Sequence, residues 1–159
     1  MRQGNNDLKI RPADWCDSAV TYLWVNNLQT RLMSFNTAII KQDEHEAWFR
    51  ESLSMPNRHI FICDDQITQE SIGIVRFDIS GYCAVVSINL APKMRGKNKA
   101  KFCLIGAVDA LVRDHPELET IKAKIKIVNI ASRRAFESAG FILESKDTHQ
   151  ICLQLNVRK

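Results

Sequence analysis

The chain has 159 residues, 45% of them hydrophobic and 25% charged, with six glycines, four prolines and a formal net charge of +4. This composition is typical of a globular domain and excludes a disordered, collagen-like or coiled-coil chain. At this length folding buries roughly 70% of the unfolded surface, so a single domain over residues 1–159 needs no metal or disulfide to hold its core.

The sequence predicts a cytoplasmic protein without a metal centre. The segment Met1–Asp7 is polar and lacks the apolar stretch of a secretory signal, and the longest apolar run, Cys103–Val108, is far too short to span a membrane. The five cysteines share no CxxC spacing, and the four histidines are never spaced i, i+4. We therefore expect free structural thiols and no bound metal.

Strand and helix patterns divide the first part of the chain. Alternation, capping residues and turn signals predict the following elements in order: a strand at 8–11, a helix at 15–26, a helix at 43–55, and strands at 60–63, 71–79 and 82–90. The last three strands are separated by short turn signals, with Gly81 at the tightest turn, which indicates an antiparallel meander.

The second part of the chain begins with a crossover unit. A basic loop after Pro92 leads into a largely apolar helix, and the remaining elements follow at short intervals: a helix at 98–114, a strand at 120–128, a helix from 129 that ends at 140, and strands at 141–143 and 151–155. In the strand at 120–128, Lys122, Lys124 and Lys126 alternate with apolar residues, which favours one apolar and one solvated face.

The positive charge is concentrated in the basic loop, where five cations lie within nine residues: Lys93, Arg95, Lys97, Lys99 and Lys101. The loop immediately precedes a helix, whose first N–H groups and dipole attract anions. Gly96 permits close backbone approach, so a pyrophosphate with a further phosphate suits the loop. On this segment alone, a solvated basic turn is an equal alternative.

Two motifs, taken together, resemble those of the GNAT superfamily of N-acetyltransferases. The segment 90–100, LAPKMRGKNKA, is similar to the acetyl-CoA loop R/Q-x-x-G-x-G/A, and the segment 129–141, NIASRRAFESAGF, is similar to N-x-x-S followed by Y-E-x-x-G-F. The predicted elements follow the order of that family over nearly the whole chain. The resemblance implies a single-domain α/β fold with a mixed, mostly antiparallel sheet that splays between its fourth and fifth strands and carries helices on both faces.

The resemblance also implies acetyl-CoA as cosubstrate, with pantetheine in the splayed gap and a backbone N–H polarising the acetyl carbonyl. The residues expected to bind it are Ile88, Leu90, Arg95, Gly96, Lys97, Asn98, Lys99, Ala100, Asn129, Ser132 and Phe136. Asn129 fits equally well as a plain helix cap.

Two residues depart from the family motifs. Asn98 stands where the family usually has Gly, and Asn is the non-glycine residue that best tolerates a left-handed backbone. Phe136 replaces a tyrosine that protonates the departing thiolate in many relatives, and phenylalanine has no proton to donate. A thiol with a pKa around 8.5 leaves tolerably as its anion, so transfer without a dedicated acid is expected.

The resemblance implies that an amine attacks the thioester directly, without a covalent enzyme intermediate. The segment WVNN at 24–27 and the residues DEH at 43–45 resemble a W-R-N and E-E-H pattern. This pattern occurs in acetyltransferases for nucleotide-linked amino sugars of pseudaminic-acid-type biosynthesis, and in related ribosomal-protein and polyamine enzymes. Val25 stands where the pattern has Arg. The expected substrate-binding residues are Trp24, Asn26, Phe35 and Trp48.

The amine must lose a proton before it attacks, because amines near pKa 10 are mostly protonated at neutral pH. His45 is the first candidate for the proton acceptor, followed by Glu44 and Asp78. His45 shares its helix face with aromatic residues, so a buried structural histidine is the alternative. Glu44 has an alternative role at the helix N-terminus, and Asp78 at a strand end.

These inferences predict an acetyl-CoA-dependent N-acetyltransferase for a primary amine. An amino sugar, free or nucleotide-linked, is preferred to a protein N-terminus or a polyamine, since a polyamine favours an acidic pocket. A CoA-binding sensor without turnover is a second hypothesis, and a nucleic-acid binder ranks below both because the basic loop lacks interleaved aromatics. The expected partners are acetyl-CoA and a small amine, with a homodimer as an option and no membrane.

Overall fold

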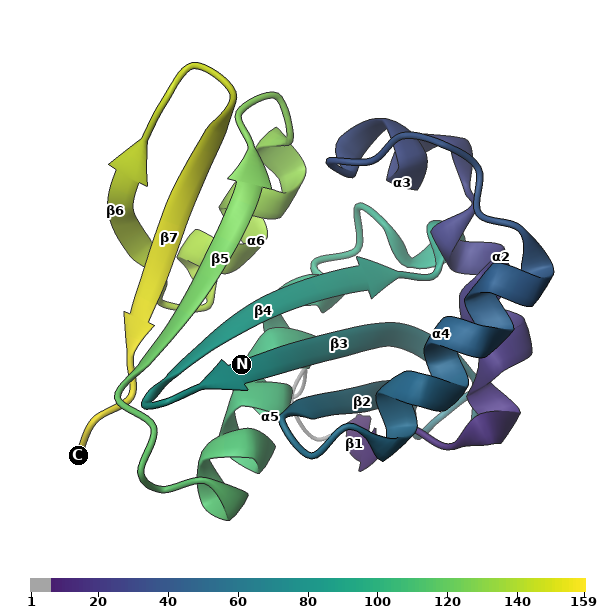
Figure 1. Cartoon of the computed structure of the whole chain (residues 1–159), viewed down its shortest axis with the longest axis horizontal. Coiled ribbons are helices and arrows are strands. Elements are labelled where there is room, and N and C mark those ends of the chain that lie inside the picture. The colour runs from purple at the N-terminus through teal and green to yellow at the C-terminus, as the bar shows by residue number, and fades with distance from the viewer. Residues whose placement is uncertain (1–6) are drawn as a thin grey trace.

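A seven-stranded sheet runs through the protein in the order β1-β2-β3-β4-β5-β7-β6 (Figure 1). The computed structural model describes residues 7–159, so residues 1–6 of the segment used to exclude a secretory signal lie outside the described residues. The strands are β1 Leu8–Pro12, β2 Arg58–Asp65, β3 Ser71–Ser80, β4 Cys83–Leu90, β5 Thr120–Lys126, β6 Ile142–Lys146 and β7 Gln150–Asn156.

Helices cover both faces of the sheet, with α4 in front of the strands and α5 behind them (Figure 1). The helical segments are η1 Trp15–Asp17, α2 Ser18–Val25, α3 Leu28–Met33, α4 Gln42–Ser54, η2 Pro92–Met94, α5 Lys99–Asp114 and α6 Ile130–Ser138. Every sheet pairing is antiparallel except that of β4 with β5. The predicted α/β fold with a mixed, mostly antiparallel sheet is confirmed.

Helix α3 is the element that the sequence prediction missed. The sequence predicts one helix that ends at Asn26 and no further helix before residue 43, whereas Asn26 caps the end of α2 and Asn27 caps the start of α3. The Asn27 side chain accepts a hydrogen bond of 3.1 Å from the Gln29 backbone N–H. A six-residue helix shows less than two turns of periodicity, too little for a pattern to be recognised.

The sheet opens between β4 and β5. These parallel strands pair only over three positions, Cys83–Val85 with Thr120–Lys122. Beyond them the strands diverge, which Figure 1 shows as a wedge between the two halves of the sheet. The splay expected between the fourth and fifth strands is therefore confirmed. It leaves the polar backbone groups on the β5 side of Val86–Leu90 without a strand partner.

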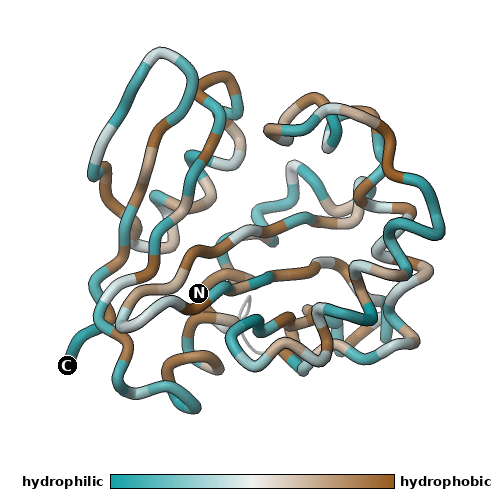
Figure 2. Tube along the Cα trace, in the orientation of Figure 1, coloured by the Kyte–Doolittle hydropathy of each residue, from teal (hydrophilic) through white to brown (hydrophobic). Residues whose placement is uncertain are grey.

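The hydrophobic core lies between the sheet and α5, where Phe77, Leu104 and Ile121 are fully buried. Hydrophobic residues follow the central strands and α5, and hydrophilic residues gather in the connecting loops (Figure 2). All five cysteines are free thiols; Cys63 and Cys103 belong to this core, whereas Cys16 is exposed. Within residues 7–159, no helix combines the length and apolarity needed to cross a membrane.

Leu104→Ala tests whether α5 is held by this core. Removing a fully buried leucine side chain should lower the free energy of unfolding by about 2–5 kcal/mol, because transfer and cavity terms add. Leu23→Ala on α2 is the control, since that side chain is 68% exposed and its loss should change stability by less than about 0.5 kcal/mol. Urea unfolding of both variants measures the difference, and equal losses would contradict the assignment.

Candidate active site

Two cavities meet at the splay. The helix-side cavity, of about 570 Å³, lies among α2, α3, α4 and the strands β3, β4 and β5. The loop-side cavity, of about 620 Å³, lies among the basic loop, the start of α5 and α6. A shared wall joins them, made of Thr30, Met33, Ser34, Ile88, Asn89, Asn129 and Ser132. A ligand in one cavity can therefore reach a ligand in the other at the end of β4.

The loop-side cavity contains the opening turn of α5. Asn98 has φ 58° and ψ 26°, which is the left-handed conformation expected of it, and Gly96 also has a positive φ of 75°. The Asn98 side chain makes no capping hydrogen bond to the helix. Residues 98–101 line the cavity, so the first α5 amides are available to an anion there. Of the other residues expected to bind the cosubstrate, Ile88, Leu90, Lys99 and Ala100 line the same cavity, whereas Lys97 does not.

Arg95 lines the loop-side cavity but turns its guanidinium toward α3. Its Nη1 donates to Asn27 Oδ1 at 2.9 Å, and its Nη2 donates to the Thr30 hydroxyl. Burial lowers the pKa of Arg95 from its ordinary value. Arg95 thus ties the basic loop to α3, a contact that sequence spacing did not predict.

The second motif, at segment 129–141, contributes Asn129, Ser132 and Phe136 to the cavity walls. Asn129 Oδ1 accepts a 3.2 Å hydrogen bond from the Ser132 backbone N–H, so Asn129 caps α6 and also lines both cavities with Ser132. Phe136 is buried, packs edge-on against Phe141 at 5.0 Å between ring centres, and lines the helix-side rather than the loop-side cavity. The aromatic ring therefore has a packing role besides any contact with a ligand.

His45 is a buried wall residue of the helix-side cavity. Its Nε2 lies 3.1 Å from the Ser18 carbonyl oxygen and 3.3 Å from the Thr21 hydroxyl. A carbonyl only accepts, so Nε2 carries the proton and the lone pair is on Nδ1. The rings of Tyr22 and Trp48 pack against the imidazole. Burial lowers the pKa of His45, so the ring is neutral at pH 7.

The other two candidates for the proton acceptor occupy different surroundings. Glu44 is exposed and lines the helix-side cavity beside His45. Asp78 does not line that cavity, and its carboxylate forms ion pairs with Arg58 Nε at 2.6 Å and Arg76 Nε at 3.4 Å. The carboxylate oxygens of Asp78 are therefore already engaged by two guanidinium groups.

The predicted substrate-binding residues divide into two groups. Phe35 and Trp48 line the helix-side cavity. Trp24 is 5% exposed and packs in the interior, and it lines neither cavity. Asn26 also lines neither, because its side chain is hydrogen-bonded to the backbone of Ile40 through both Nδ2 (2.6 Å) and Oδ1 (2.9 Å). The structure thus gives Asn26 the role of fixing the segment before α4.

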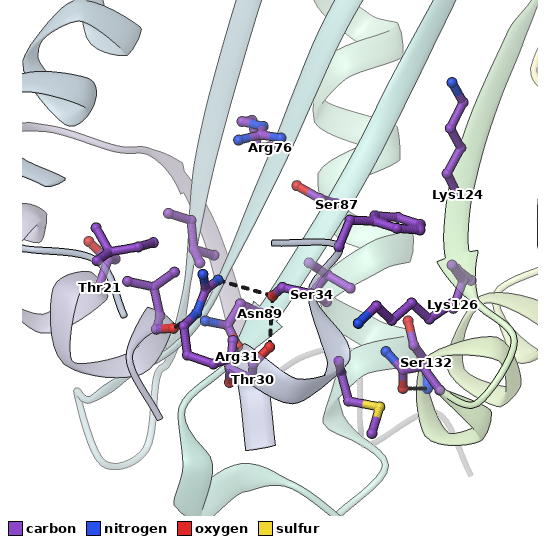
Figure 3. A pocket seen from close by; sticks show the side chains of 18 of the residues that line it. Thr21, Thr30, Arg31, Ser34, Arg76, Ser87, Asn89, Lys124, Lys126 and Ser132 are labelled. Carbon is purple, nitrogen blue, oxygen red and sulfur yellow. Dashed lines mark hydrogen bonds between the residues drawn. The ribbon is translucent and has the colours of Figure 1, made fainter. Parts of the chain in front are cut away.

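Several polar residues of the helix-side cavity were missed by the sequence reasoning. They come from α3, β3, β4 and β5, and Figure 3 shows them around the cavity: Thr30, Arg31, Ser34, Arg76, Ser87, Asn89, Lys124 and Lys126. The lysines were recognised, but their alternation predicted only a solvated strand face. The apolar residues of β5 are buried, as the alternation predicts. Lys124 and Lys126 lie on the opposite face of the strand, which faces the cavity.

Among residues 7–159, no group of three or more His, Cys, Asp or Glu side chains is arranged to hold a metal ion.

The comparisons with known proteins agree with this architecture. A family model described as an acetyltransferase (GNAT) domain matches residues 7–142. The chain therefore belongs to the GNAT family and is an acetyl-CoA-dependent N-acetyltransferase, which confirms the resemblance at family level. A search of curated proteins finds no match.

Solved structures with the same fold include enzymes for different amines. A spermidine N-acetyltransferase from Vibrio cholerae, in complex with CoA and spermine, has a TM-score of 0.85 at 19% identity over 96% of both chains. An aminoglycoside acetyltransferase with coenzyme A and kanamycin has a TM-score of 0.80 at 17% identity over 94% of this chain and 95% of its own. A domain from Methanocaldococcus jannaschii has a TM-score of 0.81 at 20% identity, with 94% and 98% covered.

Substitution of Asn98 tests the opening turn of α5. A β-branched residue in a left-handed conformation is strained, by about 1–2 kcal/mol, so Asn98→Val should weaken acetyl-CoA binding by about tenfold or more. Asn98→Gly removes the side chain but tolerates the same backbone, and it is the matched control that should bind as well as the parent. Calorimetric titration with acetyl-CoA measures both; equal binding by Asn98→Val would contradict a role for this turn.

The buried His45 predicts an acid-sensitive stability. Because burial lowers its pKa in the folded state from the ordinary 6.5, the unfolded chain binds the proton more readily. The stability contributed by the neutral ring is therefore complete above pH 6.5 and is lost as the pH falls below 6.5 toward the folded pKa.

The variant His45→Gln keeps a donor for Ser18 but cannot titrate. It should show a shallower loss of stability between pH 7 and pH 5 than the parent, measured by urea unfolding. His59, whose pKa is also lowered by burial, should leave part of the dependence in both proteins. An unchanged slope would show that His45 does not titrate in this range.

Proposed function

We propose that this N-acetyltransferase acetylates the primary amine of a small molecule, with an amino sugar, free or nucleotide-linked, as the preferred acceptor. The observation that supports the proposal most directly is the pair of cavities joined at the end of β4. One has the anion-binding features expected for a nucleotide carrier, and the other has the size and aromatic walls expected for a small acceptor.

The residues of the loop-side cavity fit acetyl-CoA. Uncapped α5 amides and the side chains of Lys99 and Lys101 meet there, which suits a pyrophosphate. Arg134 on α6 lines the opposite side and adds a further cation for a phosphate. When bound, the thioester supplies the acetyl group to be transferred.

The end of β4 supplies the groups that face the thioester. Beyond Val85, alternate backbone N–H groups point into the wedge without a strand partner, and they are held rigidly by the β3 ladder on the other edge. A fixed N–H at Ile88 stabilises the negative charge that develops on the carbonyl oxygen as the amine attacks. This contribution requires no movement of the strand.

The group that accepts the proton of the attacking amine lies in the helix-side cavity. His45 is neutral and has its lone pair on Nδ1, and Glu44 adds a carboxylate on the same wall. We retain His45 as the first proton acceptor, with Glu44 as the second, and place Asp78 last because two arginines already bind it.

The acceptor class follows from the lining of the helix-side cavity. Polyamines and aminoglycosides, the ligands named for the similar structures, carry several positive charges, whereas this cavity contains four cationic side chains and one carboxylate, Glu44. Like charges in a partly buried cavity repel. An amino sugar, with one amine and several hydroxyls, avoids that repulsion and matches the polar and aromatic walls.

An amine panel with acetyl-CoA, monitored by release of free thiol, tests the proposed function. Glucosamine, spermidine, kanamycin and a peptide with a free N-terminus represent the acceptor classes. We expect amine-dependent thiol release that is greatest for the amino sugar and is lost in Asn98→Val. Thiol release that is slow and unaffected by any amine would instead favour a CoA-binding sensor, and a clear preference for spermidine would replace the amino sugar by a polyamine.

A further inference from the structure

Positively charged side chains outnumber negatively charged ones in the lining of the helix-side cavity. Its charged lining residues, within the described part of the chain, are Arg31, Glu44, Arg76, Lys124 and Lys126, besides the neutral His45. Exposed cations alone carry no information, because a solvated lysine is ordinary on any surface. A cation without a hydrogen bond or ion pair to the protein is the one that is available to a ligand.

Two of the four cations donate hydrogen bonds to backbone carbonyl oxygens. The Arg31 guanidinium donates to the carbonyl oxygens of Val25 at 2.7 Å and Asn36 at 3.0 Å, and it thereby holds the loop after α3. The Lys126 ammonium donates to the carbonyl oxygen of Leu32 at 3.1 Å. Both cations fasten α3 and its loop over the splay, and neither is fully available to a ligand.

Arg76 is held in place but incompletely neutralised. Its guanidinium lies over the Trp48 ring at 5.6 Å, and Arg58 lies over the same ring at 5.7 Å. Both arginines share the single carboxylate of Asp78, which is 2.6 Å from Arg58 but 3.4 Å from Arg76. Arg76 Nε is buried and has no hydrogen-bond partner among residues 7–159. Two guanidinium groups and one carboxylate leave one positive charge uncompensated beside the cavity.

Lys124 faces the same space from the other side of the splay. Its neighbour on the same strand face, Lys122, forms a 2.8 Å ion pair with Glu144. No ion pair of Lys124 is found within residues 7–159, although it lines the cavity. Ser87 is the cross-strand partner of Arg76. Figure 3 shows Arg76 and Ser87 on one side of the cavity and Lys124 on the other, away from Ser132 at the shared wall.

Together, Arg76, Lys124 and Ser87 form a part of the helix-side cavity that suits an anion. The positive charge that Asp78 leaves uncompensated would be neutralised by an oxyanion bound to the exposed part of the Arg76 guanidinium. A guanidinium, an ammonium and a hydroxyl approaching from different sides suit a phosphate, which offers three or more acceptor oxygens, better than a planar carboxylate. The phosphates of the acetyl carrier are expected instead in the loop-side cavity, beyond the shared wall.

We propose that Arg76, Lys124 and Ser87 bind a phosphate group of the acceptor, so that the amine acetylated by this enzyme belongs to a phosphorylated molecule such as an amino sugar phosphate. This inference rests on the proposed function, because it concerns the acceptor of the same acetyl transfer. Arg76 is fixed by Trp48 and Asp78 before the ligand arrives, which reduces the ordering cost of binding. The phosphate would orient the acceptor with its amine toward the shared wall.

Amines that differ only in their phosphate test the proposal. Glucosamine, glucosamine 6-phosphate and UDP-glucosamine are compared at saturating acetyl-CoA, so that the loop-side cavity is occupied. The kcat/KM for the better phosphorylated amine should exceed that for glucosamine by about tenfold or more. The preference should narrow at 0.5 M salt, where charge interactions are screened. The monophosphate and nucleotide arms distinguish the two sources of phosphate.

Matched variants assign the preference to the named cations. Lys124→Gln and Arg76→Gln should each remove most of the preference by raising KM for the phosphorylated amine much more than KM for glucosamine. Lys122→Gln, two residues away on the same strand face, and Arg50→Gln, another arginine stacked on a tryptophan, line neither cavity and are the controls. If Arg76→Gln does not fold, Lys124→Gln alone tests the proposal, because its side chain is exposed and its loss should leave the fold intact.

Binding without turnover separates this inference from the proposed function. With CoA present, glucosamine 6-phosphate should raise the unfolding temperature of the parent by more than glucosamine does at the same concentration, and Lys124→Gln should lose this difference. This result supports the anion site even when no amine is acetylated, in which case the proposed function alone fails. Equal use and equal binding of glucosamine and its phosphate, or preservation of the preference in Lys124→Gln, would overturn the anion site and leave the acetyltransferase assignment intact.

Discussion

The short pairing between β4 and β5 is the constraint on which the rest of the structure depends. Three paired positions join the strands, and beyond Val85 the backbone of β4 has a partner on one edge only. A continuous sheet would satisfy every one of these groups, so the open wedge is maintained by what lies around it. The two cavities, the exposed amides of β4 and the inward face of β5 all follow from this divergence.

Helix α3 and its loop hold the wedge open from above by contacts to both halves of the sheet. Arg95 in the basic loop bonds to Asn27 and Thr30, while Lys126 on β5 bonds to Leu32. A six-residue helix has little stability of its own. Its position therefore depends on these polar contacts, and it links the turn expected to hold the carrier's phosphates to the walls of the acceptor cavity.

The charge of the helix-side cavity bears on the choice of acceptor. Within the described residues the cavity has four cationic side chains and a single carboxylate among its lining, and Asp78, which lies outside the lining, is shared by Arg58 and Arg76. Similarity to solved structures at 17–20% identity establishes the fold alone, so the acceptor has to be argued from the side chains.

Local signals in the sequence determined the elements, the opening turn of α5 and the family, because glycine, asparagine and alternating apolar residues act through neighbouring backbone. They also identified Asn98 as the left-handed residue and Asn129 as a cap. Only the tertiary structure decided which residues share a cavity. Lys124 lies on an exposed strand face, as its alternation predicts, but only the divergence of β5 from β4 brings it to the acceptor cavity. Trp24 is buried in the interior and does not line that cavity. Both placements depend on contacts between residues distant in sequence.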